Sequence, residues 1–233
     1  MRHLVIVPTY NEIENIQSLL PQLMKLRQDL DVLVVDDNSP DGTAGKVKEL
    51  AESEPRIHLL LRTKKEGLGK AYLAGFQWGL ENGFETLTEM DADFSHRPED
   101  LSKILDEIPK KDFIVGSRYV QGGRVVNWSL LRKLISRGGS LYSKFIMGFP
   151  LNDWTGGFNC WRRDSLKAME LEKVTSEGYC FQIELKYRAL RAGLQGQEVP
   201  IVFEDRRVGQ SKMSLRIVLE AFYKVWFIRF AGS

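Results

Sequence analysis

Glu89-Met90-Asp91-Ala92-Asp93-Phe94-Ser95-His96 is the stretch of this 233-residue chain on which the interpretation of the whole sequence depends. It follows a short β-type run and precedes Pro98, which marks the start of a helix. Two carboxylates one residue apart at the end of a strand need a cation or strong hydrogen-bond donors if they are buried. With the hydroxyl of Ser95 they form a set of hard oxygen ligands of the kind that Mg²⁺ or Mn²⁺ prefers. The alternative is an acidic turn that caps the helix, and the rest of the chain has to distinguish the two.

The composition is that of a globular chain that can bury a core. Hydrophobic residues make up 43% and charged residues 27%, and one domain, with or without an appendage, is expected. The net charge of +2 favours no particular charged partner, and no nucleic acid partner is expected. Cys160 and Cys180 form no C-x-x-C pair, which fits a reducing compartment. Neither a signal peptide nor an apolar run of roughly 18 residues is recognisable, so we expect a soluble or peripheral protein.

Strands and helices alternate along the first half of the chain. Strands are expected at residues 4–7, 32–35, 57–61, 86–88 and 113–117, with helices between them. This alternation predicts a parallel, doubly wound sheet, in which ligands bind beyond the carboxyl ends of the strands. Polar residues stand at these ends: Tyr10 and Glu12, Asp36 and Asp37, Asp91 and Asp93, and Arg118. The pattern therefore predicts one shared site. A later strand at residues 199–203 contains a proline and is expected at an edge.

Two common phosphate-binding motifs are excluded. A dinucleotide fingerprint would place G-x-G-x-x-G after the first strand, where the chain has Pro8-Thr9-Tyr10-Asn11-Glu12. A P-loop would need a glycine at Lys64 and a serine or threonine at Ala71. Any nucleotide is therefore expected to bind through carboxylates and a metal ion rather than through a glycine-rich cradle.

The middle of the chain is free of acidic residues from Phe113 to Asn152. Its six basic residues are Arg118, Arg124, Arg132, Lys133, Arg137 and Lys144. They alternate with large apolar residues, a pattern that suits a surface resting on anionic headgroups and receiving a phosphorylated lipid. The alternative is a solvated helix face with its apolar side in the core.

The C-terminal quarter carries two further signals. Arg206, Arg207 and Lys212 surround Gly209 in a loop that can hold phosphate, unless it is an ordinary basic surface loop. A helix from Ser214 to about Phe230 has a wide, aromatic-rich apolar face. Such a helix either lies in a membrane interface, docks a membrane subunit, or packs on the sheet.

The ordered set of motifs resembles the dolichol-phosphate mannose synthases, which are polyprenyl-phosphate mannosyltransferases of glycosyltransferase family 2. The matching segments are Pro8–Glu12, Val35–Thr43, Gly67–Tyr72, Met90–His96, Gly116–Tyr119, Ser136–Gly138, Gly178–Gln182, Glu198–Ile201 and Asp205–Lys212. They occur in the family's order and cover nearly the whole chain, although no single segment is specific.

The resemblance implies a type A glycosyltransferase fold, a Rossmann-like, mostly parallel α/β sheet flanked by helices. Residues 1–212 would be the catalytic domain and residues 213–233 a C-terminal amphipathic helix. The donor would be a nucleotide-sugar, GDP-mannose by preference, and the acceptor a polyprenyl or dolichyl monophosphate. The enzyme would work at the cytoplasmic face of a membrane, with the terminal helix or a small membrane subunit bringing it to the lipid.

The resemblance also assigns residues to roles. The nucleoside would be held by Pro8, Tyr10, Glu12, Val35 and Asp37. The donor would also contact Asp91, Ala92 and Asp93, with Asp91, Asp93 and Ser95 around Mg²⁺ or Mn²⁺. Phosphates would be held by Arg118, Arg206 and Lys212, and the acceptor by Arg118, Arg132 and Arg137. Asp93, Arg206 and Lys212 would be catalytic.

The implied chemistry needs no general base. A lipid monophosphate has a second pKa of about 6 and is already a nucleophile at neutral pH. It would displace the diphosphate in line with inversion, and the metal, Arg206 and Lys212 would neutralise the leaving group. The alternatives are a polyprenyl-phosphate glucosyltransferase or another family 2 enzyme that uses a UDP-sugar, and a non-catalytic subunit that binds nucleotide-sugar.

Overall fold

The computed structural model describes residues 1–205 and 215–231. Its strands are β1 (His3–Thr9), β2 (Leu30–Asp36), β3 (Ile57–Leu61), β4 (Thr86–Glu89), β5 (Phe113–Ser117), β6 (Arg124–Val125), β7 (Asn159–Arg162), β8 (Gly196–Pro200) and β9 (Val202–Phe203). Its α-helices are α1 (Ile13–Leu26), α2 (Thr43–Ser53), α3 (Leu68–Glu81), α4 (Pro98–Glu107), α5 (Leu130–Met147), α6 (Arg163–Ala168), α7 (Gly178–Arg191) and α8 (Leu215–Ala231).

The central sheet is mostly parallel, as the alternation of strands and helices predicted. In the described part of the chain its order is β3-β2-β1-β4-β7-β5-β8, and a separate two-stranded sheet joins β6 to β9. β7 is antiparallel to both of its neighbours, β4 and β5. This short strand was not predicted. The strand expected at residues 199–203 is divided, with Pro200 at the end of edge strand β8 and β9 paired to β6.

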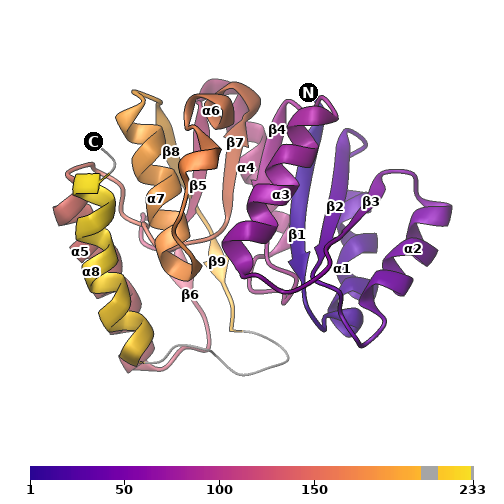
Figure 1. Ribbon diagram of the computed structural model, residues 1–233, viewed down its shortest axis with the longest axis horizontal. Coiled ribbons are helices and arrows are strands. Elements are labelled where there is room, and N and C mark those ends of the chain that lie inside the picture. Colours follow the sequence, from indigo (N-terminus) through magenta and orange to yellow (C-terminus); the bar gives the residue numbers. More distant parts are fainter. Residues whose placement is uncertain (206–214, 232–233) are drawn as a thin grey trace.

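Alternate residues of the inner strands enter two separate cores. On β1, Leu4 and Ile6 pack with α3, α6 and α7, whereas Val5 and Val7 pack with α1, α2 and α4 (Figure 1). All four side chains are fully buried. Side chains of this kind each contribute about 1.5–3 kcal/mol when they are removed from water. The sheet is therefore buried on both faces, which explains the continuous apolar runs of its strands.

Two glycines let α3 lie close to the sheet. A Cβ atom on Gly75 would come within 2.5 Å of Cγ2 of Ile6, and one on Gly79 would collide with Leu87. A larger residue at either position would push the helix away from β1 and β4. The close contact fixes where α3 begins, next to the carboxyl ends of the strands.

α5 and α8 form a pair at the opposite end of the sheet from β3 (Figure 1). Tyr142 stacks on Phe222 with ring centroids 3.9 Å apart, and Nε1 of Trp226 donates to the Tyr142 hydroxyl at 2.7 Å. Val225 and Ile228 of α8 are buried in the core shared with α7. Across residues 1–205 and 215–231 no helix has the length and apolarity needed to cross a membrane.

Candidate functional site

Four strands bring the polar residues named from the sequence to one side of the sheet. β1 is parallel to β2 and β4, and β5 runs in the same direction because β7 is antiparallel to both β4 and β5. The segments that follow these strands therefore leave the sheet at a common side, the carboxyl edge. Pro8 and Val35 are register partners there on β1 and β2.

The two aspartates after β2 have different environments. Asp36 is fully buried and accepts hydrogen bonds from the Thr9 hydroxyl at 2.7 Å and from the Ser39 backbone at 2.9 Å. It holds the turn together. Asp37 forms an ion pair with Arg62 at 3.2 Å, and burial raises its pKa although the Arg62 charge opposes this shift. Arg62 was missed in the sequence, where its only signal was its position directly after a strand.

The segment after β1 offers an aromatic ring to the carboxyl edge. The Tyr10 side chain is 38% exposed, and Nζ of Lys65 lies 3.8 Å from its ring centroid. The Glu12 carboxylate accepts a hydrogen bond from Asn15 at 2.6 Å, and its backbone N–H donates to Thr43 at 3.1 Å. These two hydrogen bonds hold Glu12 at the start of α1.

The acidic stretch forms a tight turn. The Asp91 carboxylate accepts a hydrogen bond from the Tyr72 hydroxyl at 3.2 Å, and its backbone N–H donates to Nδ1 of His96 at 3.0 Å. The Asp93 carboxylate accepts from the Ser95 backbone at 3.0 Å, and Phe94 between them adopts a left-handed φ of 60°. Because Nδ1 of His96 accepts from the Asp91 backbone, the ring carries its proton on Nε2, and burial lowers the pKa of His96.

The oxygen atoms of this turn suit a hard cation. Oγ of Ser95 is buried without a hydrogen-bond partner in the described part of the molecule, and Asp93 is only 7% exposed. Although no three histidine, cysteine or acidic side chains converge as a complete ligand set within residues 1–205 and 215–231, Mg²⁺ is usually bound by one or two carboxylates together with substrate phosphates and water. Asp91, Asp93 and Ser95 fit that kind of site.

Arg118 is held by an acidic residue whose role was not recognised in the sequence. Its Nε and Nη2 atoms donate to the Asp153 carboxylate at 2.7 and 2.6 Å, its backbone N–H donates to the same carboxylate at 2.9 Å, and Nη2 also reaches Thr155 at 2.9 Å. Burial alone would raise the pKa of Asp153, but Arg118 outweighs it and lowers this pKa to about 2. Nη1 of Arg118 makes no hydrogen bond within the described residues.

The other basic residues named from the sequence differ in whether the structure describes them and in what they contact. Arg132 pairs with Asp205 at 2.7 Å and lies 4.1 Å from the Trp128 ring centroid, while Arg118 lies 5.8 Å from the same centroid. Trp128 therefore links the two arginines. Arg137 is exposed on α5. Arg206 and Lys212 lie outside the described residues, so their assigned roles stay predictions.

A buried network of hydrogen bonds holds Glu89, the first residue of the acidic stretch. Glu89, fully buried at the end of β4, accepts hydrogen bonds from Trp161 at 2.8 Å, Asn159 at 3.2 Å and Gln182. Burial raises its pKa, whereas these donors favour the ionised form. This role was not recognised in the sequence, because the partners come from β7 and α7.

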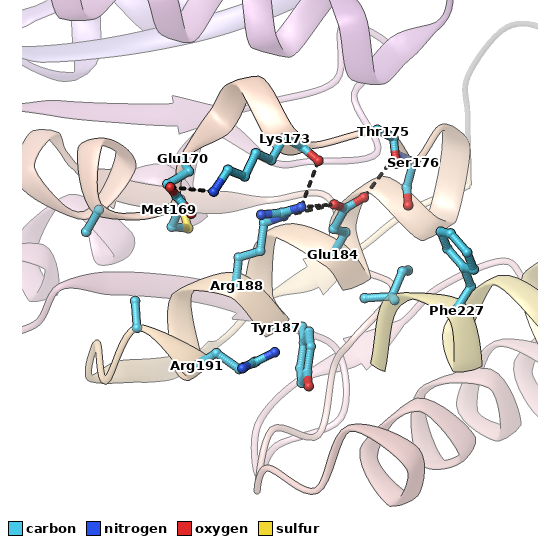
Figure 2. A pocket seen from close by; sticks show the side chains of 13 residues that line it. Met169, Glu170, Lys173, Thr175, Ser176, Glu184, Tyr187, Arg188, Arg191 and Phe227 are labelled. Carbon is cyan, nitrogen blue, oxygen red and sulfur yellow. Dashed lines mark hydrogen bonds and ion pairs between the residues drawn. The ribbon is translucent and has the colours of Figure 1, made fainter. Parts of the chain in front are cut away.

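A separate cavity of about 560 Å³ lies between α7, α8 and the segment from Ala168 to Ser176. Figure 2 shows that four of its charged side chains form two pairs: Lys173 with Glu170 at 2.7 Å and Arg188 with Glu184 at 2.8 Å. Glu184 also accepts from the Ser176 backbone at 3.0 Å and so closes the turn before α7. None of the strand-end residues named above lines this cavity.

Comparisons with known proteins agree with the geometry. The model of the family "Glycosyl transferase family 2" matches residues 4–169. The undecaprenyl-phosphate mannosyltransferase of Micrococcus luteus is 48% identical over 225 residues, 97% of this chain and 93% of that protein. The polyprenol monophosphomannose synthase of Mycolicibacterium smegmatis is 48% identical over 232 residues, 98% of this chain and 88% of that protein.

A solved structure shows the same fold. The mannosyltransferase of Pyrobaculum calidifontis, in complex with GDP-Man and Mn²⁺, superposes with a TM-score of 0.63 at 20% identity, over 100% of this chain and 64% of that one. The expected type A glycosyltransferase fold is thereby confirmed. With a matching family model over most of its length and two relatives at 48% identity, the chain belongs to glycosyltransferase family 2.

Proposed function

We propose that the protein transfers mannose from GDP-mannose to a polyprenyl monophosphate with inversion, giving polyprenyl-phosphate-mannose. The observation that carries the proposal is the arrangement of the carboxyl edge, where the Asp91–Ser95 turn and the partly engaged Arg118 offer a cation site and an anion site. The names of the two relatives at 48% identity support the mannose donor and the lipid phosphate acceptor.

The donor half of the site is assigned to β1, β2 and β4. Tyr10 would stack on the nucleoside beside Pro8 and Val35, and Asp37 would accept from it while Arg62 holds the carboxylate. Asp91, Asp93 and Ser95 would hold Mg²⁺ or Mn²⁺ next to Ala92, and the Mn²⁺ in the Pyrobaculum structure supports this choice. Such an ion supplies a positive charge that neutralises the departing diphosphate. Arg206 and Lys212 are proposed to add to that charge.

The acceptor half is assigned to Arg118 and Arg132, with Arg137 further along α5. A lipid monophosphate needs no base to act as a nucleophile at neutral pH. His96, the histidine at the carboxyl edge, is unsuited to such a role, because its Nδ1 accepts from the Asp91 backbone and its neighbours bury it. The residues of this half therefore bind and orient the phosphate rather than move a proton.

The test is transfer of labelled mannose from GDP-mannose to a short polyprenyl phosphate, with Mg²⁺ or Mn²⁺ and with EDTA. We expect a lipid product that requires the metal and is stable in alkali but labile in mild acid. Product from UDP-glucose instead would establish the glucosyltransferase alternative. GDP binding with no transfer from either donor would favour the non-catalytic alternative.

We also propose that the protein lies on the surface of a membrane, on its anionic cytoplasmic leaflet. The contact would be the α5–α8 surface, a set of large apolar side chains of which each is at least 45% exposed: Leu130, Leu131, Leu134, Leu141, Phe145, Phe222, Tyr223, Trp226, Phe227 and Phe230. Exposed apolar patches of this extent mark interaction sites. The basic residues of α5 lie among them without any acidic residue, which suits anionic headgroups.

Phe145→Glu, at an 84% exposed position, is expected to lower binding to vesicles of anionic phospholipid by about tenfold, because a buried charge replaces apolar area in the interface. Sedimentation with vesicles measures this. Leu61→Glu on β3, 49% exposed at the other end of the sheet, is the control and should bind like the unchanged protein. Equal binding of both variants would contradict the assignment of this surface and leave the proposed transfer untouched.

A further inference from the structure

Lys186 of α7 is a charged residue without any access to solvent. Its side chain is fully buried, and Nζ donates hydrogen bonds to three backbone carbonyl oxygens: Asp153 at 3.0 Å, Trp154 at 3.2 Å and Gly156 at 2.7 Å. An ammonium group has three donors, so the carbonyl groups match it completely. Burying a charged group is unfavourable unless it is hydrogen-bonded. The three hydrogen bonds of Lys186 therefore tie it to the segment that supplies the carbonyl groups.

The charges around Lys186 come from every element packed against it. Asp153 precedes β7, Glu89 lies on β4, Glu198 on β8 and Arg118 after β5, and all four act on its charge. Burial lowers the pKa of Lys186, and the three carboxylates oppose this shift. The fully buried Glu89 and Asp153 balance the two cations, Lys186 and Arg118.

The segment that Lys186 grips, residues 152–156, is also held from β8. The Glu198 carboxylate accepts from the backbone N–H groups of Asn152 and Asp153, each at 2.9 Å. The Asp153 carboxylate in turn accepts from the Gly156 backbone at 2.9 Å. Lys186 and Glu198 therefore fix the backbone of the same residue whose side chain holds Arg118.

We propose that Lys186 is a positioning residue of the transfer reaction. By fixing residues 152–156 it orients Asp153, and through Asp153 it presents the open side of the Arg118 guanidinium to the acceptor phosphate. The inference rests on the proposed role of Arg118 in holding that phosphate. It assigns a role beyond stability, since a buried ion pair is by itself weak evidence for stabilisation.

The hydrogen bonds of Lys186 and Glu198 are expected to affect binding of the acceptor but not of the nucleotide. The residues proposed to hold the nucleoside come from β1, β2 and the segment after β3, whereas Lys186, Glu198 and residues 152–156 border β5 and α5. Loss of Lys186 should therefore disturb the acceptor and leave the nucleotide in place. A general loss of structure would weaken both.

The experiment compares Lys186→Met with Lys173→Met, an exposed lysine paired with Glu170 near the start of α7. Lys186→Met is expected to raise KM for the polyprenyl phosphate by about tenfold to a hundredfold, because a small displacement of a positioning group has effects of that order. The Kd for GDP should stay within about twofold, as a ligand held by unaltered contacts requires. Lys173→Met should change neither quantity.

A double-mutant cycle identifies the route of the effect. In an Arg118→Lys background, Lys186→Met should raise the acceptor KM much less than in the unchanged protein, because both substitutions act on one contact. An unchanged acceptor KM in folded Lys186→Met, a parallel loss of GDP affinity, or full additivity in the cycle would overturn the proposal.

Glu198→Gln keeps the test decisive if Lys186→Met does not fold. Glu198 is only partly buried and holds the same segment from the edge strand. Glu198→Gln should also raise the KM for the polyprenyl phosphate, and an unchanged KM would overturn the proposal. If the unchanged protein transfers no mannose, the proposed function fails. In that case amide hydrogen exchange still tests whether Lys186 and Glu198 hold residues 152–156. The backbone N–H groups of Arg118 and Gly156 donate to Asp153, and their exchange must be faster in the variants. Unchanged exchange would overturn the proposal.

Discussion

Asp93→Ala is expected to lower mannose transfer by about a thousandfold or more, since the substitution removes a carboxylate from the proposed cation site, whose ion would neutralise the leaving diphosphate. Asp93 is 7% exposed, and its carboxylate accepts from the Ser95 backbone within the turn. The measurement is the rate of transfer at saturating Mg²⁺ or Mn²⁺, together with the affinity for the metal and GDP.

Asp93→Asn separates the charge from the turn. The amide oxygen can still accept from Ser95, so the turn should persist, and the loss of transfer should nevertheless be nearly as large. Asp106→Ala removes a carboxylate that is 68% exposed on α4 and should leave the rate unchanged. Normal turnover by Asp93→Ala at low metal concentration would exclude the metal model.

The second large effect concerns stability. Asp153→Ala is expected to lower the free energy of unfolding by about 3–5 kcal/mol, because it leaves the buried guanidinium of Arg118 without its counter-ion. Denaturant unfolding at neutral pH measures the loss. Asp106→Ala serves again as the control, because its exposed ion pair with Arg27 should be worth less than about 1 kcal/mol.

The ion pair between Arg118 and Asp153 also predicts a loss of stability at acidic pH. In the folded protein the pKa of Asp153 is about 2, below its ordinary value, since Arg118 and its hydrogen bonds outweigh the effect of burial. A carboxylate with a lowered folded pKa stabilises the protein above its unfolded pKa. Its contribution, about 2–3 kcal/mol, is lost as the pH falls from about 4 to 2.

Asp153→Ala should therefore show a shallower loss of stability between pH 4 and 2 than the unchanged protein. Urea unfolding at a series of pH values in this range gives the comparison. If the free energy of unfolding fell equally steeply with pH in the two proteins, Asp153 would not titrate with a lowered pKa. The loss of stability expected for Asp153→Ala at neutral pH would be unaffected by that result.

The carboxyl edge could be predicted from the sequence because its causes are local. Buried parallel strands read as continuous apolar runs, and the polar residues that follow each run must emerge where the strand ends. Val32 to Val35 followed by Asp37, and Leu87 followed by Asp91, needed no knowledge of the rest of the chain. The order of the motifs then pointed to the family.

The supports of the site could not be predicted, because they join segments that are distant in sequence. Arg118 and Asp153 are 35 residues apart, and Lys186 contacts carbonyl groups 30 to 33 residues before it. Nothing in the sequence around Lys186 indicates these contacts. These contacts depend on the tertiary fold, in which β7 pairs with both β4 and β5.

The C-terminal helix shows the same division. Its wide apolar face left open whether it lies in a membrane interface, docks a membrane subunit or packs on the sheet, and the structure shows that one side of its described part packs in the core. Val225 and Ile228 are buried in the core, whereas Tyr223 and Phe227 on the same helix are exposed. The amino-acid sequence by itself determined strands β1 to β5, their polar ends and the acidic turn, because short-range patterning encodes them. The tertiary structure alone decided which charges are paired and which apolar side chains stay exposed, because both depend on which distant segments come into contact.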